Sequence, residues 1–276
     1  MTDASQGSFA IPKIKREERS SVINLPALGI GTSSAPENLD PSAAKSAILY
    51  AIGLGYTHFQ IEVSSYLEQL VGEAIAEALQ NGTVQSRDKF YITSKIRFAD
   101  AASDSIVPNL KKSLETLNME SVNVFLLEWP ENDKTFSAND FVSAWRAMEE
   151  CESLGLAKVI GVGNFTTEML GSLLQIATTA PGANEIGMEP MWRDKNLRAF
   201  CEDNDIVILV SSAVDGEDKD FDYSEFMKSE GLKIEKDGVL KTPEQVYFKW
   251  AYEQGAAVFL ESFSEQRMKE MLQIFQ

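Results

Sequence analysis

The chain has 276 residues, of which 44% are hydrophobic, and its 42 acidic and 25 basic residues give a net charge of −17. This length and apolar content suit one domain with a large core, so we expect a single domain over residues 1–276 with residues 1–10 disordered. The acidic balance argues against nucleic acid or an anionic membrane as a partner. There is no apolar run of the roughly 18 residues that a membrane span needs.

The N-terminal stretch lacks the positive start and apolar segment of a secretory signal. Cys151 and Cys201 are far apart in sequence and lie in helix-like stretches, which is typical of thiols in a cytoplasmic protein rather than of a disulfide. The single histidine, His58, excludes a histidine-rich metal site and a Ser–His–Asp triad elsewhere.

Apolar strand-like runs alternate with amphipathic helical stretches along the whole chain, the pattern of repeated βα units. The opening pair Ile11–Lys15 and Ser21–Leu25 predicts a hairpin that closes the barrel bottom. Eight strands are then predicted at Ala27–Gly31, His58–Ile61, Tyr91–Ile96, Val122–Leu127, Val159–Gly163, Glu185–Met188, Val207–Val210 and Val258–Leu260. The predicted fold is therefore an α/β class (β/α)₈ TIM barrel with an N-terminal hairpin.

Helix start and stop signals support this division. Asp40 followed by Pro41 predicts a helix N-terminus, and Gly55 predicts its end. Asn81-Gly82 closes a second helix. Thr242 with Gln245 three residues later predicts a capping box before the last strand.

Five segments resemble the aldo-keto reductase family in order and spacing. They read GYTHFQ (55–60), ITSK (92–95), FLLEWP (125–130), GVGNF (161–165) and LESF (260–263). Family members usually read HFD…Y, ITSK, LIHWP, GVSNF and KSF at these places. The resemblance covers residues 20–276 and is closest to plant chalcone, codeinone and methylecgonone reductases. It implies a barrel that transfers hydride from NADPH to a carbonyl.

The resemblance also implies where catalytic groups belong, and three of the four have been exchanged. The family's Asp, Tyr and His positions hold Gln60, Ser65 and Glu128, and only the Lys, Lys95, is kept. A serine hydroxyl is far too weak an acid near neutral pH to replace an activated phenol. Tyr66 is the next residue, and a one-residue bulge would be needed to turn it inward.

Lys95 and Glu128 allow two readings. The first is a salt bridge that closes the barrel mouth, because a buried lysine needs a partner once the family's aspartate is Gln60. The second is a relocated acid/base pair, with Glu128 moving a proton or Lys95 acting as a nucleophilic amine. A glutamate replaces the same histidine in the steroid 5β-reductase branch, which keeps its Tyr, Lys and Asp.

The positions that the resemblance assigns to NADPH are also altered. The tyrosine that stacks on the nicotinamide is Ser211, and the lysine that meets the 2′-phosphate is Glu261. The full set of implied cofactor positions is Gly31, Thr32, Asn164, Glu185, Ser211, Ser212, Glu261, Ser262, Arg267 and Glu270, with Gly163 and Met271 where the family has Ser and Asn. A stacked ring, an amide contact and a phosphate clamp are lost together.

Two loops and one end also differ from the resemblance. The loop at 131–138 is short where relatives wall the substrate pocket, and the stretch 215–222 is acidic where the family's loop covers the pyrophosphate. The family's C-terminal tail is lacking after Gln276. We therefore expect a degenerate active site with no or weak NADP(H) binding.

Three functional hypotheses follow. The first is a pseudo-reductase, a monomer that binds a hydrophobic small-molecule metabolite or another protein. The second is a redox-independent isomerase, cyclase or lyase that uses Glu128 and Lys95. The third is a residual NADPH-dependent carbonyl or enone reductase with Tyr66 as the acid.

Overall fold

The computed structural model describes residues 11, 13–16, 23–33, 35, 39–100, 102–130, 138–187, 194–213, 223–234, 240 and 242–276. Some of the predictions concern residues outside these ranges. They are the disorder of 1–10, the short loop at 131–138 except for residue 138, the end of a strand at Met188 and the acidic stretch 215–222. Within the described chain no helix is long and apolar enough to cross a membrane.

Eight parallel strands close into a barrel, in the order β10-β3-β4-β5-β6-β7-β8-β9. Their bounds are β3 Leu28–Gly31, β4 His58–Glu62, β5 Tyr91–Arg97, β6 Val122–Glu128, β7 Ala157–Gly163, β8 Ala183–Ile186, β9 Val207–Ala213 and β10 Ala257–Glu261. The predicted (β/α)₈ fold is confirmed. The strand predicted at Glu185–Met188 begins two residues earlier than expected, and most of the others are longer by one to three residues.

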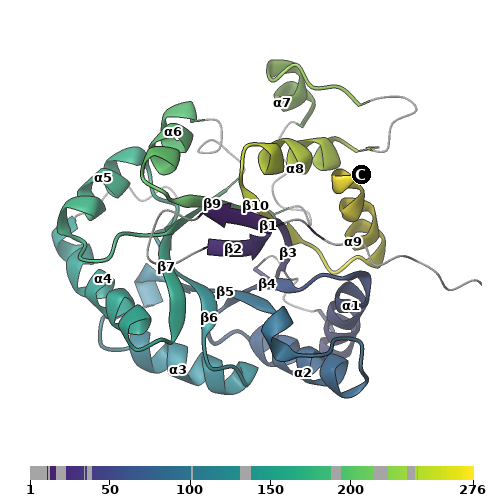
Figure 1. Cartoon of the computed structure of the whole chain (residues 1–276), viewed down its shortest axis with the longest axis horizontal. Coiled ribbons are helices and arrows are strands. Elements are labelled where there is room, and N and C mark those ends of the chain that lie inside the picture. Colours follow the sequence, from purple (N-terminus) through teal and green to yellow (C-terminus); the bar gives the residue numbers. More distant parts are fainter. Residues whose placement is uncertain are drawn as a thin grey trace, which may run out of the picture.

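The hairpin predicted at the N-terminus is also present. Strand β1 (Lys13–Arg16) pairs antiparallel with β2 (Ile23–Pro26), and Figure 1 shows the pair lying across the near end of the barrel. Leu25 and Ala27 join a cluster that fills the barrel interior, whose other members include Val124, Leu126 and Phe259. The hairpin therefore closes the bottom of the barrel with apolar side chains.

A ring of helices surrounds the strands (Figure 1). Their bounds are α1 Pro41–Leu54, α2 Tyr66–Gln80, α3 Ile106–Leu117, α4 Ala138–Ser153, α5 Thr167–Ile176, α6 Lys195–Asp203, α7 Tyr223–Ser229, α8 Pro243–Glu253 and α9 Glu265–Met271, with 3₁₀ turns η1 Arg87–Lys89, η2 Phe98–Asp100 and η4 Leu272–Phe275. A second, larger apolar core lies between the helices and the outer faces of the strands.

The predicted helix caps are observed. The Asp40 carboxylate accepts a hydrogen bond from the backbone N–H of Ala43, and Gly55 ends α1 with φ 99°. Thr242 and Gln245 form the reciprocal bonds of a capping box at the start of α8. These local signals fix where each helix begins and ends, and so where each strand enters the barrel.

His58 is buried at the bottom of the barrel, beneath the hairpin. Its Nδ1 donates to the carbonyl of Pro26 at 3.2 Å, which leaves Nε2 to accept from the Thr93 hydroxyl at 2.9 Å. Burial lowers the pKa of His58 to about 4, although the bond to Pro26 acts in the opposite direction. The histidine is therefore a neutral structural residue.

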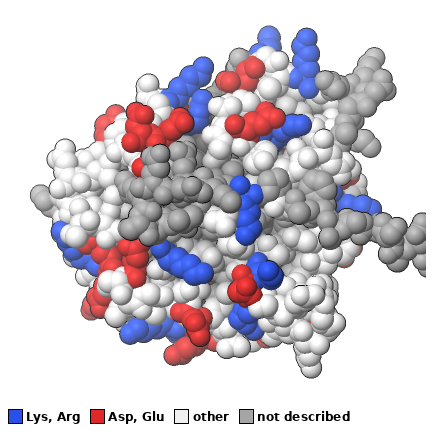
Figure 2. Space-filling view, in the orientation of Figure 1, with Lys and Arg blue, Asp and Glu red and all other residues white. Residues whose placement is uncertain are grey.

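On the face of the molecule that carries the N-terminal hairpin, acidic and basic side chains are interspersed (Figure 2).

Candidate functional site at the barrel mouth

A cavity of about 430 Å³ opens at the carboxyl ends of the strands. Among the described residues its lining comprises Ser33, Lys95, Arg97, Ala99, Glu128, Trp129, Pro130, Asn164, Glu185, Gly187, Ser211 and Glu261. Catalytic and ligand-binding residues of (β/α)₈ enzymes lie at this end of the strands. Of the positions assigned to catalysis the lining includes Lys95 and Glu128, and of those assigned to the cofactor it includes Asn164, Glu185, Ser211 and Glu261.

Lys95 is the centre of the site. Lys95 lies near the end of β5 and is 6% exposed. Its Nζ lies 3.1 Å from Glu128 Oε1 on β6 and 3.5 Å from Glu185 Oε1 on β8. The predicted Lys95–Glu128 salt bridge is therefore formed. The second partner, Glu185, was assigned from the sequence only to the cofactor.

The charges at the site are unequal. Burial alone would lower the pKa of Lys95. The carboxylates of Glu185, Glu128 and Glu261 raise the pKa of this lysine by more, so its pKa stands above its ordinary value. Lys95 is therefore an ammonium ion at neutral pH, and this protonation state does not suit it as a nucleophile.

Glu128 shows the other side of this inequality. Burial raises the pKa of Glu128, and the attraction of Lys95 offsets only part of the rise because Glu185 acts against it. Both partners of one salt bridge thus have a raised pKa. The two shifts are consistent, because Glu185, Glu128 and Glu261 together attract the Lys95 ammonium, whereas the attraction of Lys95 for Glu128 is opposed by burial and by the charge of Glu185.

Two of these glutamates lie against glycines. A Cβ at Gly31 would overlap the carboxylate of Glu261, which itself is only 2% exposed. A Cβ at Gly163 would lie 3.2 Å from Cγ of Glu128, closer than side chains normally pack. Gly163 stands where the resemblance implies serine, so its lack of a side chain gives Glu128 its room.

The two carboxylate oxygens of Glu185 differ in their polar contacts. Its Oε1 accepts a hydrogen bond from the Ser211 hydroxyl at 2.9 Å and is also the atom near Lys95. Its Oε2 is buried and has no hydrogen-bond partner within the described part of the chain. Ser211 thus holds Glu185 in place.

Among the described residues, Gln60 makes no hydrogen bond to Lys95. Its side-chain amide is fully buried on β4, and neither amide atom has a hydrogen-bond partner among the described residues. Thr32 donates its hydroxyl hydrogen to the backbone carbonyl of Gln60 at 3.0 Å. In the described part of the chain the ion-pair partners of Lys95 are therefore Glu128 and Glu185.

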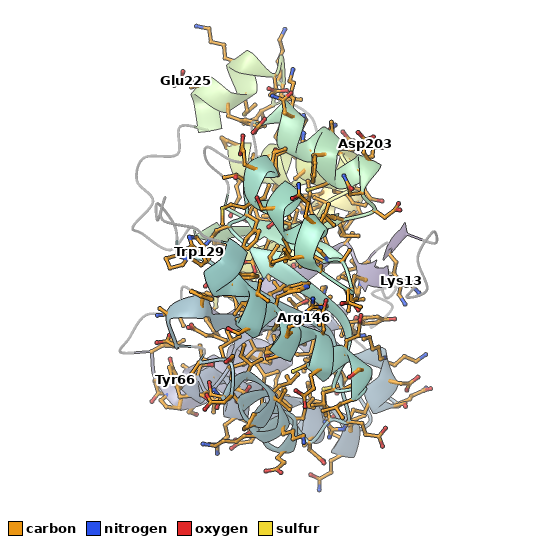
Figure 3. All side chains as sticks on the ribbon, turned by 90° about the vertical axis from the view of Figure 1, so that its left-hand side faces the viewer. Lys13, Tyr66, Trp129, Arg146, Asp203 and Glu225 are labelled. Carbon is orange, nitrogen blue, oxygen red and sulfur yellow. The ribbon has the colours of Figure 1, made fainter. Side chains whose placement is uncertain are left out.

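Tyr66 and Ser65 lie at the start of α2. Ser65 is the N-cap, with a buried hydroxyl that has no partner among the described residues. Tyr66 is the first residue of the helix, 47% exposed, and it is not among the described residues that line the cavity. In Figure 3, Tyr66 and Trp129 both lie at the end opposite Lys13. Tyr66 is thus a half-exposed residue at the start of α2, outside the described lining of the cavity.

The other described residues that the resemblance assigns to the cofactor make contacts within the protein. Arg267 forms an ion pair with Glu244 at 2.6 Å, and Ser262 accepts a hydrogen bond from the N–H of Ser264 at 3.1 Å. Asn164 has φ 62° and donates to the carbonyl of Trp129 at 2.9 Å. The Glu270 carboxylate accepts from Gln266 at 2.8 Å. The side chain of Ser212 lies outside the described part of the structure.

The mouth holds residues that the sequence reading did not assign. Arg97 lines the cavity and pairs with Glu62 at 2.6 Å, and Trp129 packs on Phe98 with ring centroids 4.7 Å apart. The position of Arg97 at the mouth could have been predicted from the sequence, because residues i and i+2 of a strand share a face and Lys95 was expected to point inward. Nothing in the sequence pattern singles out Ser33.

A family model described as "Aldo/keto reductase family" matches residues 27–276. The chain belongs to the aldo-keto reductase family. It is 38% identical over 263 residues to a "7-acetyl-epi-neemfruitin B aldo-keto reductase" of Melia azedarach, covering 92% of this chain and 81% of that protein. It is also 38% identical over 267 residues to "NADPH-dependent codeinone reductase 1-2" of Papaver somniferum, covering 93% and 83%. The predicted likeness to plant reductases is confirmed.

Solved aldo-keto reductases share this fold. A Bombyx mori aldo-keto reductase in complex with NADP superposes with a TM-score of 0.75 at 23% identity, covering 97% of this chain and 88% of that one. An aldo/keto reductase from Brucella melitensis superposes with a TM-score of 0.74 at 26% identity, covering 97% and 94%.

Proposed function

We propose that this chain is an aldo-keto reductase barrel that has lost standard NADPH-dependent carbonyl reduction and instead binds a small molecule at the barrel mouth. The observation that carries this proposal is the placement of Glu261. Its carboxylate is buried against Gly31, at the position where the resemblance implies a lysine for the 2′-phosphate. A buried carboxylate repels a phosphate dianion instead of attracting it.

The other changes at the mouth support the same proposal. Ser211 offers a hydroxyl, already bonded to Glu185, where the resemblance implies a stacking ring. The residues present therefore do not fit NADP(H) well. Losing a stacked ring, an amide contact and a phosphate clamp would weaken binding by roughly three to five orders of magnitude if the losses add approximately.

Proton donation is the second missing element. Ser65 holds the tyrosine position and is an N-cap with no ring, and Tyr66 is half exposed at the start of α2. Carbonyl reduction needs an acid within hydrogen-bond reach of the oxygen that gains charge. This placement argues against the alternative in which Tyr66 supplies the proton.

Isothermal titration of the purified protein with NADPH tests the proposal. The matched control is a variant that restores the implied residues, Ser211→Tyr with Glu261→Lys. We expect the dissociation constant of the natural chain for NADPH to lie well above about 1 μM. The restored variant should bind NADPH at least about tenfold more tightly than the natural chain does. Micromolar or tighter binding by the natural chain, or NADPH-dependent turnover of an aldehyde, would overturn the proposal.

One observation favours a second candidate, a redox-independent acid/base enzyme. Glu128 lines the cavity, and burial raises its pKa, as is usual for a carboxyl that exchanges protons with a ligand. Exchange of the α-protons of cyclohexanone with D₂O, followed by NMR, tests this candidate. Glu128→Gln should abolish any exchange that the natural chain catalyses, and an equal rate in both proteins would remove the candidate.

A further inference from the structure

Lys95 and Glu128 both have hydrogen-bonding capacity to spare at the cavity. An ammonium carries three N–H donors, and among the described residues the Nζ of Lys95 meets two acceptors, Glu128 Oε1 at 3.1 Å and Glu185 Oε1 at 3.5 Å. Glu128 Oε2 accepts no hydrogen bond within the described ranges and, unlike Glu185 Oε2, is not a fully buried atom. The Glu128 side chain is 21% exposed and lines the cavity, so a ligand can reach this oxygen.

The donor and the acceptor are held side by side. Lys95 on β5 and Glu128 on the neighbouring strand β6 line the same cavity. Glu185 contacts the ammonium from β8, and the Ser211 hydroxyl holds Glu185 through a hydrogen bond of 2.9 Å. A ligand oxygen that accepts from Lys95 therefore lies next to the open oxygen of Glu128.

A carbonyl compound with an α-hydrogen matches this pair of groups. Its α-carbon is two bonds from its oxygen, so one molecule can accept from Lys95 and present a C–H bond to Glu128. When the Glu128 carboxylate takes the α-proton, the C–H electron pair forms a C=C bond and the carbonyl π electrons move to the oxygen. The resulting enolate oxygen is negative, and a donor already aimed at it stabilises the transition state. The reverse step returns a proton from Glu128 to the carbon.

The electrostatics of the cavity favour a neutral substrate. Burial lowers the pKa of Lys95, but the carboxylates of Glu185 and Glu128 raise this pKa by more, so the ammonium keeps its proton and stays a donor. A carboxylate on the ligand would lie beside Glu128 and Glu185, whereas a ketone or aldehyde brings no charge of its own. Trp129 and Pro130 provide an apolar wall for its carbon skeleton.

We propose that Lys95 is a catalytic residue of a proton-transfer site, where its ammonium donates a hydrogen bond to the carbonyl oxygen of a neutral ketone or aldehyde while Glu128 takes and returns the α-proton. This inference rests on the second candidate function, the redox-independent acid/base enzyme. It adds to that candidate the residue that stabilises the oxyanion and the chemical class of the substrate.

Exchange of the α-protons of cyclohexanone with D₂O, followed by NMR, tests the role of Lys95. We expect exchange at least about a hundredfold slower in Lys95→Ala than in the natural chain, because an oxyanion donor is lost. Lys158→Ala is the matched control, since it makes the same change at an exposed position on β7, and it should keep the natural rate. Thermal unfolding of each variant confirms that the protein compared is folded.

Chemical rescue distinguishes a hydrogen-bond donor from a structural charge. Methylammonium can enter the space that the lysine side chain leaves in Lys95→Ala, and it should accelerate exchange by at least about tenfold. Tetramethylammonium has the same charge and no N–H group, so it should not accelerate exchange. Equal rescue by the two ions, or an unchanged rate in Lys95→Ala without either, would overturn the role of Lys95.

A second measurement needs no variant. The carbonyl carbon of ¹³C-labelled cyclohexanone should move downfield when the ketone binds the natural chain, because its oxygen accepts a hydrogen bond. A bound resonance that does not move downfield would overturn the inference even if Lys95→Ala fails to fold.

The outcomes separate this inference from the proposed functions. Exchange that is lost in Glu128→Gln but unchanged in Lys95→Ala removes the role of Lys95 and leaves the acid/base candidate standing. No exchange by the natural chain removes both. Titration with NADPH tests the loss of NADPH use independently of either result.

Discussion

Replacing Lys95 with methionine should destabilise the protein in a manner that depends strongly on pH. Methionine keeps the length of the side chain and removes its charge. Lys95 is 6% exposed and lies 3.1 Å from Glu128 and 3.5 Å from Glu185. Removing one partner of a buried ion pair costs about 3–5 kcal/mol. Glu128 is 21% exposed at its side chain, so we expect a loss of unfolding free energy near the lower limit, about 3 kcal/mol at neutral to alkaline pH.

The pH dependence follows from the loss of the ammonium. In the natural chain Lys95 lowers the pKa of Glu128 against the rise caused by burial, so the variant's Glu128 has a pKa raised further above its unfolded value. A group whose folded pKa is raised contributes stability at low pH that is lost as pH increases through that folded pKa. The deficit of Lys95→Met should therefore shrink on acidification.

Urea unfolding followed by tryptophan fluorescence measures this deficit at several pH values. The double variant Lys95→Met with Glu128→Gln is the control, because it removes one of the stranded carboxylates and should regain part of the loss at alkaline pH. A deficit below about 1 kcal/mol, typical of a surface pair, would refute the reasoning. A deficit that is the same at acidic and alkaline pH would refute it as well.

Three further outcomes test other parts of the structure. Gln60→Leu should leave the unfolding free energy unchanged or raise it by about 1 kcal/mol in a urea titration, because it removes a buried amide without partners; a clear loss would contradict this. Thr242→Ala should lower the unfolding free energy by about 1 kcal/mol by breaking the capping box, with Thr242→Ser as a control that keeps the cap. The unfolding free energy should fall by up to about 3 kcal/mol as pH decreases from about 6.5 to about 4, because His58 binds a proton in the unfolded chain but stays neutral in the folded protein. His58→Gln should lack this pH-dependent contribution. A difference in unfolding free energy between the two proteins that does not change with pH would contradict the prediction.

The fold could be predicted from local signals because each one acts within a few residues. Asp40, Gly55 and Thr242 determine helix ends through hydrogen bonds to their own neighbours, and the structure confirms all three. The strand at Ala183–Ile186 was displaced in the prediction because Ala183 and Asn184 carry no strong strand pattern. Their placement depends on pairing with β7 and β9, which no local signal contains.

For the site, the sequence could predict some of the residues that lie at the barrel mouth but not the contacts between them. Position along the resemblance brought Lys95, Glu128 and Glu185 to the mouth, and the cavity contains all three. The sharing of Lys95 between two glutamates was not predictable, because it depends on side-chain directions across strands β5, β6 and β8. Whether Tyr66 turned inward likewise depended on the register of α2, which a single sequence does not determine.

The contact between Glu128 and Gly163 couples two positions that are far apart in the sequence. A Cβ at position 163 would lie 3.2 Å from Cγ of Glu128, so a side chain there requires Glu128 to give way by a few tenths of an ångström. The effects of substitutions at positions 128 and 163 are therefore not expected to add, and the length of one side chain sets the room left for the other.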